Sequence, residues 1–195
     1  MEIKRWMRLG PPKVLAESHG RSLAIQKYRD QTGKEREYSH FRGNFSSSIV
    51  LALTTDNKVL VVQQYRPAAE EITLELPGGA QKYKQQTPES VALQEIFEET
   101  SGYVPGMIFL LSETGCLYEP SSLNINFFPY LFLDCRKSFD TVSLVDDGEF
   151  INLVQIPLEE WMEMCETGQI RDSKSLAVTY LAKRHIDRYL SLRRA

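Results

Sequence analysis

The feature that most constrains the fold is a strand, a glycine turn and a helix in direct succession. The segment EITLELPGG, residues 71–79, is β-prone and ends in a Pro-Gly-Gly break. The helix that follows has a clear start, because Thr87 is a suitable N-cap and Pro88 suits the first helical position. Gly102 is a natural terminator. The sequence therefore predicts a helix that begins after Thr87 and ends before Gly102.

Further β-prone segments lie on both sides of this unit. They are residues 13–18, 22–31, 36–43, 46–55, 58–67, 106–119, 124–135 and 149–157. The first three suggest an N-terminal meander. We therefore expect an N-terminal β segment over residues 1–45 and a main domain over residues 46–195.

Two helices complete the predicted secondary structure. They are a short one in residues 158–168 and a longer one in residues 173–192. In the longer helix we expect Leu176, Ala177, Tyr180 and Leu181 to form the inward stripe. Because strands outnumber helices and the connections are short, the natural architecture is α/β, a mixed-sheet sandwich with helices packed on the sheet.

Composition narrows the classes of function. The net charge of −3 gives no basic excess to hold a nucleic acid, so we expect no such partner. No apolar run reaches membrane-spanning length, and the first residues lack the apolar stretch of a secretion signal. The three cysteines are odd in number and form no CxxC pair. Reduced thiols in a cytoplasmic protein fit this pattern best.

The predicted helix of residues 88–101 carries three glutamates on one edge. Glu95 lies three and four residues before Glu98 and Glu99, so it faces both, and like charges at that spacing repel by roughly 0.2–0.5 kcal/mol per pair. No lysine or arginine lies between Glu89 and Tyr103 to relieve the repulsion within the helix. A solvated helix face is the ordinary interpretation of such a cluster. A hard divalent cation such as Mg²⁺ or Mn²⁺ would instead make the cluster favourable, which suggests phosphate chemistry.

At these residues the chain resembles a known family. The stretch LPGGAQKYKQQTPESVALQEIFEETSGY, residues 76–103, is similar to the Nudix box, written Gx5Ex7REUxEExGU with U aliphatic. The resemblance implies the Nudix fold, an α/β/α sandwich. It also implies that Glu95, Glu98 and Glu99 coordinate a divalent metal, with Gly78 or Gly79 offering a backbone carbonyl. Family members cleave a nucleoside diphosphate linked to another moiety, using a metal-activated water.

The chain departs from the box at two coupled positions. Gln86 stands where the box has glutamate, and Gln94 stands where it has arginine. In the family these two side chains form a salt bridge that braces the loop against the helix. Two amides can hydrogen-bond where a charged pair stood, so we expect a replaced brace and a working site. One extra residue precedes Thr87 and another, Ser101, precedes Gly102.

The resemblance extends to the ADP-ribose pyrophosphatase and nucleoside-diphosphate-sugar hydrolase branch. VLVVQQYRPAAEEITLELPGG and the segment from residue 149 to 182 are similar to that branch. A proline about sixteen residues beyond the box marks it, and Pro120 lies near that spacing and is implied to be at the substrate site. The N-terminal strands fit an extra β-rich segment that forms a domain-swapped homodimer in the branch.

The resemblance also gives roles to residues outside the box. Arg66 of the QYR motif either contacts the substrate phosphate bidentately or forms a structural ion pair with a carboxylate such as Glu75. An acidic residue on the loop before residue 150 approaches the catalytic water in the family. Asp147 aligns best there, with Asp146 and Glu149 as neighbours.

These observations together indicate a pyrophosphohydrolase that acts on ADP-ribose or a related nucleoside diphosphate sugar. It would use Mg²⁺ or Mn²⁺ and yield a nucleoside monophosphate and a sugar phosphate. Two alternatives stay open at this point. One is a different substrate, such as a dinucleoside polyphosphate or capped RNA. The other is a non-catalytic module that binds a nucleotide sugar.

Overall fold

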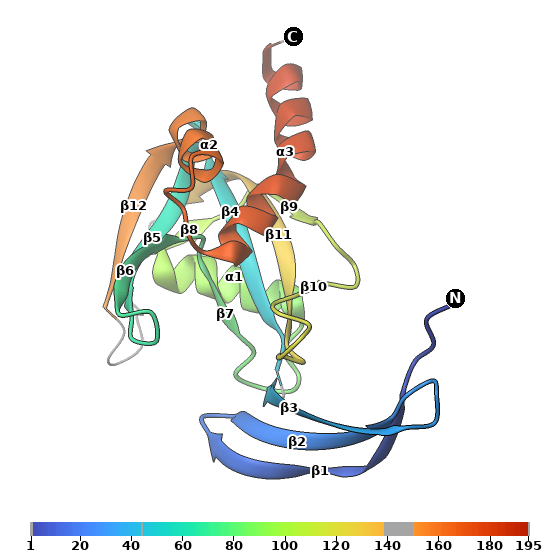
Figure 1. Ribbon diagram of the computed structural model, residues 1–195. Helices are drawn as coiled ribbons and strands as arrows, with labels where there is room; N and C mark the ends of the chain where they lie inside the picture. The colour runs from blue at the N-terminus through green and yellow to red at the C-terminus, as the bar shows by residue number, and fades with distance from the viewer. Residues whose placement is uncertain (1, 44, 139–149, 195) are drawn as a thin grey trace. The chain divides into compact units, whose positions relative to one another are not determined.

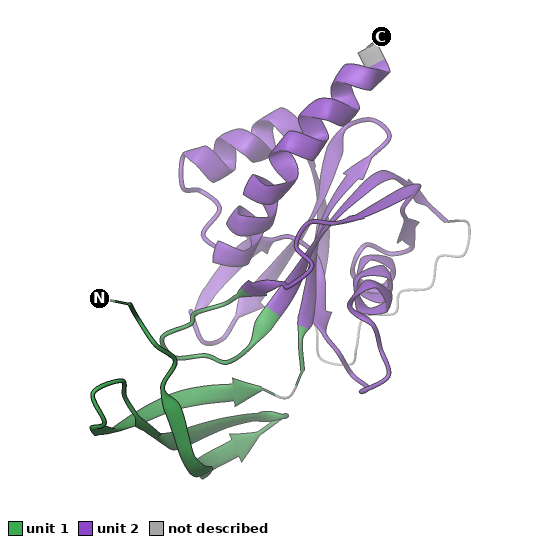
Figure 2. Cartoon of the chain, turned by 90° about the vertical axis from the view of Figure 1, so that its right-hand side faces the viewer, with its two compact units in different colours: residues 1–46, 117–126 green, residues 47–116, 127–195 purple. Residues whose placement is uncertain are grey.

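The computed structural model describes residues 2–43, 45–138 and 150–194 of the chain (Figure 1). The chain forms two compact units, coloured separately in Figure 2. One unit holds residues 1–46 and 117–126, and the other holds residues 47–116 and 127–195.

The first unit contains a three-stranded antiparallel sheet in the order β1-β2-β3. Its strands are β1 (Met7–Ser18), β2 (Arg21–Arg29) and β3 (Glu35–Gly43). His19 and Gly20, at φ values of 48° and 71°, form the two-residue turn between β1 and β2. Positive φ at both turn positions matches the twist of a tight hairpin. The predicted N-terminal meander is confirmed.

Strand β1 begins earlier than its sequence indicates. The sequence predicted a strand over residues 13–18, yet β1 starts at Met7 and contains Gly10, Pro11 and Pro12. Proline lacks the N–H that a central strand needs, but β1 is an edge strand of its sheet. A register shift between Leu9 and Lys13 absorbs the extra residues.

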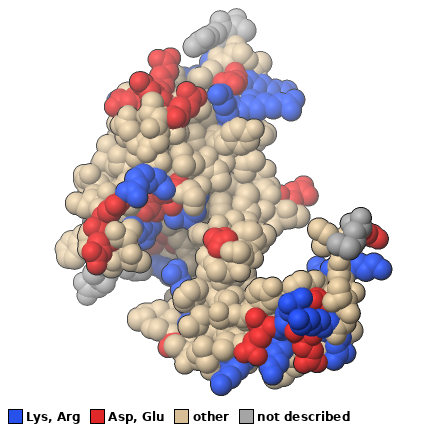
Figure 3. All heavy atoms as spheres, viewed as in Figure 1, with Lys and Arg blue, Asp and Glu red and all other residues tan. Residues whose placement is uncertain are grey.

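The turn between β2 and β3 is organised by one buried carboxylate. Asp30 Oδ1 accepts hydrogen bonds from Thr32 N (2.9 Å), Thr32 Oγ1 (2.6 Å) and Lys34 N (3.1 Å). Its other oxygen accepts from Arg36 Nε at 3.0 Å. Ion pairs such as Arg29–Glu35 join neighbouring strands, so acidic and basic side chains intermingle on this sheet (Figure 3).

The second unit is built on a mixed sheet with the central order β11-β4-β5-β12. Strand β11 runs parallel to β4, whereas β12 and β4 are antiparallel to β5. The strands are β4 (Ser47–Thr54), β5 (Lys58–Arg66), β6 (Glu71–Glu75), β7 (Gly78–Ala80), β8 (Tyr103–Val104), β9 (Met107–Leu110), β11 (Asn126–Lys137) and β12 (Ile151–Pro157). The chain passes between the units just before β4, within β10 (Cys116–Leu117) and near the start of β11.

Helices cover both faces of this sheet. They are α1 (Pro88–Glu99), α2 (Leu158–Glu166) and α3 (Ser173–Arg194). Seen edge-on, α1 lies on one face while α2 and α3 lie on the other (Figures 1 and 2). Every residue of β4 is buried, as expected for a strand covered on both sides. The predicted α/β/α sandwich is confirmed.

Helix α1 has the ends that its sequence predicts. Thr87 is the N-cap, and its side chain accepts a hydrogen bond from Ser90 N at 3.1 Å. After the helix, Gly102 has a φ of 95° and its N–H donates to Phe97 O at 2.8 Å. Ala92 and Ile96 pack into a buried cluster with strands β4, β5 and β11.

The predicted inward stripe of α3 is wrong in part. Tyr180 is 79% exposed, and the buried positions are Ser175, Val178, Thr179, Ala182 and Ile186. The actual face includes hydroxyl groups, which an apolar pattern does not pick out. They are tolerated because each is hydrogen-bonded, as where Thr179 Oγ1 accepts from Trp161 Nε1 at 3.0 Å.

The predicted strand over residues 106–119 is interrupted. Only β9 and β10 form there, because Ser112–Gly115 makes a turn in which Gly115 has a φ of 72°. None of the helices in the described ranges is both long enough and apolar enough to cross a bilayer.

Candidate active site

The site begins at the glycine pair that follows β6. Gly78 lies opposite Ile49 and Gly79 opposite Ser48, because β7 pairs with the start of β4. A Cβ atom at Gly78 would lie 2.2 Å from the backbone oxygen of Ser48. Only glycine permits so close an approach of the two strands. The Pro-Gly-Gly break therefore leads the chain along β4 and on towards α1.

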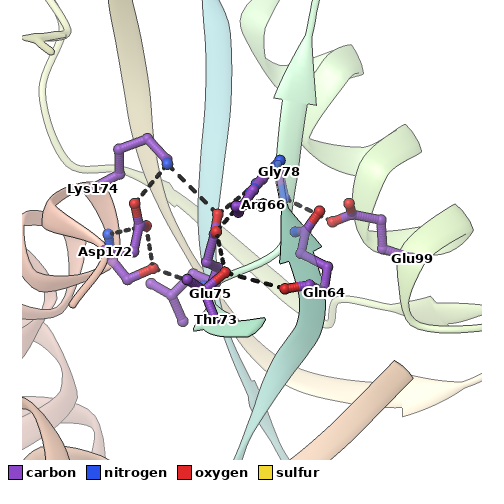
Figure 4. A network of polar contacts seen from close by, with 10 residues as sticks. Gln64, Arg66, Thr73, Glu75, Gly78, Glu99, Asp172 and Lys174 are labelled. Carbon is purple, nitrogen blue, oxygen red and sulfur yellow. Dashed lines mark hydrogen bonds and ion pairs between the residues drawn. The ribbon is translucent and has the colours of Figure 1, made fainter. Parts of the chain in front are cut away.

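Glu99 lies against this glycine turn. Its Oε2 accepts a hydrogen bond from Gly78 N at 2.8 Å (Figure 4). The structure thus brings together two residues that were predicted to share a metal. The contact uses the N–H of Gly78, whereas the predicted ligand is its carbonyl oxygen. The ligand role of Gly78 stays a prediction.

Glu95 lies against the second glycine. Its side chain is turned inward, and the whole residue is only 8% exposed. A Cβ atom at Gly79 would lie 2.5 Å from both Cδ and Oε1 of Glu95. Gly79 therefore leaves the space that the carboxylate occupies. The second glycine of the turn is required by a side chain of α1, not by the backbone of β4.

Glu98 is held by a relay of amides from the loop. Gln86 Nε2 donates to Gln94 Oε1 at 2.8 Å, and Gln94 Nε2 donates to Glu98 Oε1 at 2.8 Å. The predicted amide pair in place of a salt bridge is confirmed. Its second half was not foreseen, since Gln94 also orients a carboxylate of the candidate site. Hydrogen bonds to a charged acceptor are the stronger kind.

A lysine from the loop also contacts Glu98. Lys82 Nζ lies 3.6 Å from Glu98 Oε2, so the charge relief that α1 lacks comes from outside the helix. Lys82 was not among the predicted residues, because basic partners for the glutamates were sought only between residues 89 and 103. The lysines at 82 and 84, on the loop that leads into the helix, were the available signal.

The three glutamates fit a divalent cation in their chemistry. They supply carboxylate oxygens, which Mg²⁺ and Mn²⁺ prefer, beside a glycine that makes room for one of them. As the side chains lie, however, no three acidic, histidine or cysteine residues in the described ranges are close enough to hold an ion. The oxygens of Glu98 and Glu99 already have partners in the protein. Glu99 accepts a hydrogen bond from Gly78 N, and Glu98 accepts one from Gln94 and forms an ion pair with Lys82. A cation would have to share or replace some of these contacts.

Arg66 forms the structural ion pair that was one of its two predicted roles. Its Nε donates to Glu75 Oε1 at 2.7 Å, and its second nitrogen donates to Glu75 Oε2 at 2.5 Å (Figure 4). Hydrogen bonding to Glu75 raises the pKa of Arg66, and the nearby charges of Asp172 and Glu99 add to this effect. Arg66 thus lies within electrostatic reach of the glutamate edge. Its contact with substrate stays a prediction.

Glu75 is the centre of a wider network. Its side chain is 4% exposed, and Thr73 Oγ1 donates to it at 2.7 Å while Lys174 Nζ lies 3.6 Å away. Burial alone would raise the pKa of Glu75. Hydrogen bonds from Arg66 and Thr73, together with the positive charge of Lys174, outweigh burial and lower this pKa to about 2. Glu75 is therefore ionised throughout the physiological pH range.

The same network links the segment before the glycine pair to the first turn of α3. Asp172 accepts hydrogen bonds from both the N–H and the hydroxyl of Ser175, as an N-cap does. Ser175 Oγ in turn accepts from Leu76 N at 2.8 Å, two residues before the glycine pair. An N-cap at Asp172 could have been read from the sequence. Its link to Leu76 could not, since the two residues lie far apart in the chain.

An open hollow of about 280 Å³ lies beside this network. Its lining includes Arg66, Glu71, Glu75, Arg171, Asp172 and Lys174. Acidic side chains balance the basic ones, and Arg171 pairs with Glu71. The charged groups that line the hollow are thus already paired with one another.

Two further residues, Pro120 and Asp147, were predicted to belong to the site. Pro120 belongs to the first unit, in an exposed turn where Glu119 accepts hydrogen bonds from Ser121 and Ser122. Asp147, with its neighbours Asp146 and Glu149, lies outside the described residues. The roles of Pro120 and Asp147 stay predictions.

Comparison with known proteins agrees with these features. Residues 45–178 match the family model described as NUDIX domain. A methanol dehydrogenase activator from Bacillus methanolicus is 32% identical over 134 residues, which are 68% of this chain and 69% of that protein. An ADP-ribose pyrophosphatase from Bacillus subtilis (strain 168) is 27% identical over 133 residues, with the same shares covered.

A solved structure described as an ADP compounds hydrolase has the same fold. It superposes with a TM-score of 0.79 at 15% identity, covering 96% of this chain and 97% of that one. Identity this low speaks for the fold alone. The Nudix fold predicted from the resemblance is confirmed.

Proposed function

Because the chain belongs to the Nudix domain family, and is therefore a Nudix hydrolase, we propose that it is a metal-dependent pyrophosphohydrolase for ADP-ribose or a related nucleoside diphosphate sugar. The products would be a nucleoside monophosphate and a sugar phosphate. The similarity to an ADP-ribose pyrophosphatase supports this substrate class.

One observation carries the proposal. Glu95, Glu98 and Glu99 share an edge of α1, and two of them contact the glycine pair of β7 directly. A mere solvated face would leave the carboxylates in water, whereas Glu95 is nearly buried. Buried or crowded carboxylates need compensation by hydrogen bonds, cations or both.

Each residue of the candidate site would have a distinct role. A bound Mg²⁺ or Mn²⁺ supplies charge neutralisation of the diphosphate and acidifies the attacking water. Glu95, Glu98 and Glu99 would hold it, and the carbonyl oxygen of Gly78 would add a neutral ligand. The amide relay keeps Glu98 oriented without adding net charge. Arg66 would act mainly by bracing β6 through Glu75.

Two further roles rest on the family pattern. Asp147 would approach the attacking water as a general base, and Pro120 would shape the substrate site. Neither role requires a change in the assignments of the three glutamates. Loss of the Asp147 carboxylate would lower turnover more than substrate affinity.

We also propose that the protein is a cytoplasmic homodimer whose N-terminal segment, residues 1–45, supplies the contact between copies. Large apolar side chains exposed on the three-stranded sheet support this, including Val14, Leu15 and Tyr38. Cysteines without disulfides support a reducing compartment. Sedimentation equilibrium would detect the dimer.

Glu99→Gln is the variant that tests the metal site. It keeps the shape of the side chain but removes the charge, so we expect turnover of ADP-ribose to fall by at least about a hundredfold. Glu89→Gln is the matched control, because Glu89 is an exposed glutamate in the first turn of the same helix. Wild-type turnover in Glu99→Gln, with α1 intact by circular dichroism, would refute the proposal.

A substrate panel separates the alternatives. The wild-type protein is incubated with ADP-ribose, a dinucleoside polyphosphate and a capped RNA, each with Mg²⁺ and then with EDTA. We expect release of phosphate monoester from ADP-ribose that EDTA abolishes. Faster release from another compound would replace the substrate. Binding without release across the panel would favour a non-catalytic module.

A further inference from the structure

The loop between β7 and α1 places a positive charge on the glutamate edge. Lys82 Nζ lies 3.6 Å from Glu98 Oε2, and the two side chains are 37% and 21% exposed. We propose that Lys82 is a stand-in cation, which occupies Glu98 until a divalent metal displaces it. This inference rests on the metal-dependent function proposed above, because it concerns the same carboxylate.

The position of Lys82 is fixed by the loop, not by the ion pair alone. The backbone N–H groups of Lys82 and Tyr83 both donate to Gln86 Oε1, at 2.7 and 3.0 Å. Gln81 Nε2 donates to the backbone oxygen of Gln86 at 2.5 Å. The amide side chains of Gln81 and Gln86 therefore close the loop and bring the stem of Lys82 towards α1.

The same Gln86 begins the relay that reaches Glu98 from the other side. Gln94 Nε2 donates to Oε1 of Glu98, while Lys82 faces Oε2. The two oxygens of the Glu98 carboxylate thus have different kinds of partner. Oε1 has a neutral, directional donor that is fixed in the helix. Oε2 has a flexible ammonium at ion-pair distance, longer than a good hydrogen bond.

This division suits a carboxylate that must exchange one cation for another. A lysine on a flexible stem can leave without breaking the loop, because its backbone N–H bond to Gln86 persists. The amide of Gln94 can stay, because a carboxylate oxygen has room for a hydrogen bond and a metal. A dication on Oε2 would meet a like charge at Lys82, so the ammonium must move away.

Lys82 consequently has two opposed effects on the site. Without metal it relieves the repulsion between Glu98 and its neighbour Glu95, which the helix sequence leaves uncompensated. During metal uptake it competes with the incoming ion. Removing its charge should therefore tighten metal binding. A lysine that served only to grip substrate phosphate would leave metal affinity in the substrate-free protein unchanged.

The experiment measures metal binding by the full-length protein without substrate. Mn²⁺ is titrated into wild type, Lys82→Met, Lys82→Arg and Lys84→Met, and free Mn²⁺ is followed by electron paramagnetic resonance. Lys84→Met is the matched control, since Lys84 is an exposed lysine on the same loop and the change in net charge is equal.

We expect Lys82→Met to bind Mn²⁺ about two- to fivefold more tightly than wild type, the range of a partly exposed ion pair. Lys84→Met should stay within about 1.5-fold of wild type, because an exposed charge farther away is screened. Lys82→Arg should also resemble wild type. Raising the salt to about 0.5 M should shrink the effect of Lys82→Met.

Equal shifts in Lys82→Met and Lys84→Met would overturn the inference, because only general charge would then matter. Weaker binding in Lys82→Met would overturn it too, by making Lys82 an organiser of the site. In both cases the metal-dependent function stands. If no folded variant, wild type included, binds Mn²⁺, the metal-dependent function itself fails and the inference fails with it.

Discussion

Replacing Glu75 by glutamine should lower the stability of the second unit by an amount that depends on pH. Glu75 is buried and ionised, and its carboxylate joins β6 to Arg66 and Lys174. Glu75→Gln keeps the shape and removes the charge. Because the folded-state pKa lies below the ordinary value, the ionised carboxylate stabilises the fold above that value. The stabilisation is lost as the pH falls towards the folded-state pKa.

The magnitude follows from the size of the shift. The pKa of Glu75 falls from an ordinary 4.5 to about 2. A shift of this size corresponds to about 3 kcal/mol between the two protonation states. Arg66 is 42% exposed, so water screens part of the attraction. We therefore expect Glu75→Gln to cost about 2 kcal/mol of unfolding free energy at neutral pH.

The assay is urea unfolding of wild type and variant at about pH 5 and pH 3. Trp161 is fully buried in α2, and its fluorescence reports on the second unit once Trp6 is replaced by phenylalanine in both proteins. The difference between the two proteins should shrink by about half from pH 5 to pH 3. Glu71→Gln is the control, because Glu71 forms an exposed pair with Arg171. Its effect should stay below about 0.5 kcal/mol at both pH values.

An unchanged difference between wild type and Glu75→Gln at the two pH values would refute this reasoning. The stabilisation would then come from the shape and hydrogen bonds of the side chain, not from its charge. Carboxylates far from this network titrate alike in both proteins, so they cancel in the comparison.

Three further substitutions address the glutamate edge. Gln94→Leu removes the donor to Glu98, so kcat/KM for ADP-ribose should fall by about tenfold, and an unchanged value would show that the relay is dispensable. Gly79→Ala should weaken Mn²⁺ binding at little cost in stability, because its Cβ meets only the flexible end of Glu95. Gly78→Ala should lower the free energy of unfolding by more than about 1 kcal/mol, because its Cβ meets a backbone carbonyl. Both variants are measured by thermal unfolding and by Mn²⁺ titration. A larger loss of stability in Gly79→Ala than in Gly78→Ala, or weaker Mn²⁺ binding only in Gly78→Ala, would contradict the roles given to the two glycines.

Local signals in the sequence were sufficient for the helix that carries the site. Thr87, Pro88 and Gly102 act through their nearest neighbours, so the ends of α1 could be placed without knowledge of the fold. The amide pair was also predictable, because Gln86 and Gln94 depart together from a pattern in which their counterparts touch. The continuation of this contact to Glu98, through the second hydrogen bond of Gln94, was not predictable.

Contacts between distant segments were harder to foresee. Arg66 had two equally reasonable roles, and only the pairing of β5 with β6 shows that Glu75 is within reach. Lys82 was missed because its partner lies sixteen residues away, across a loop whose course no local rule gives. The buried face of α3 was misjudged because Ser175 and Thr179 become compatible with burial only through their tertiary partners.

The neutral character of the Gln86–Gln94 contact has a consequence for the conditions that the site tolerates. Neither amide gains or loses a proton between acid and alkali, and dissolved ions hardly weaken a bond between uncharged groups. An arginine–glutamate clasp in the same place would loosen in brine or at low pH. This chain should therefore keep the loop of residues 81–87 in register with α1 in media where such a charged clasp would begin to fail.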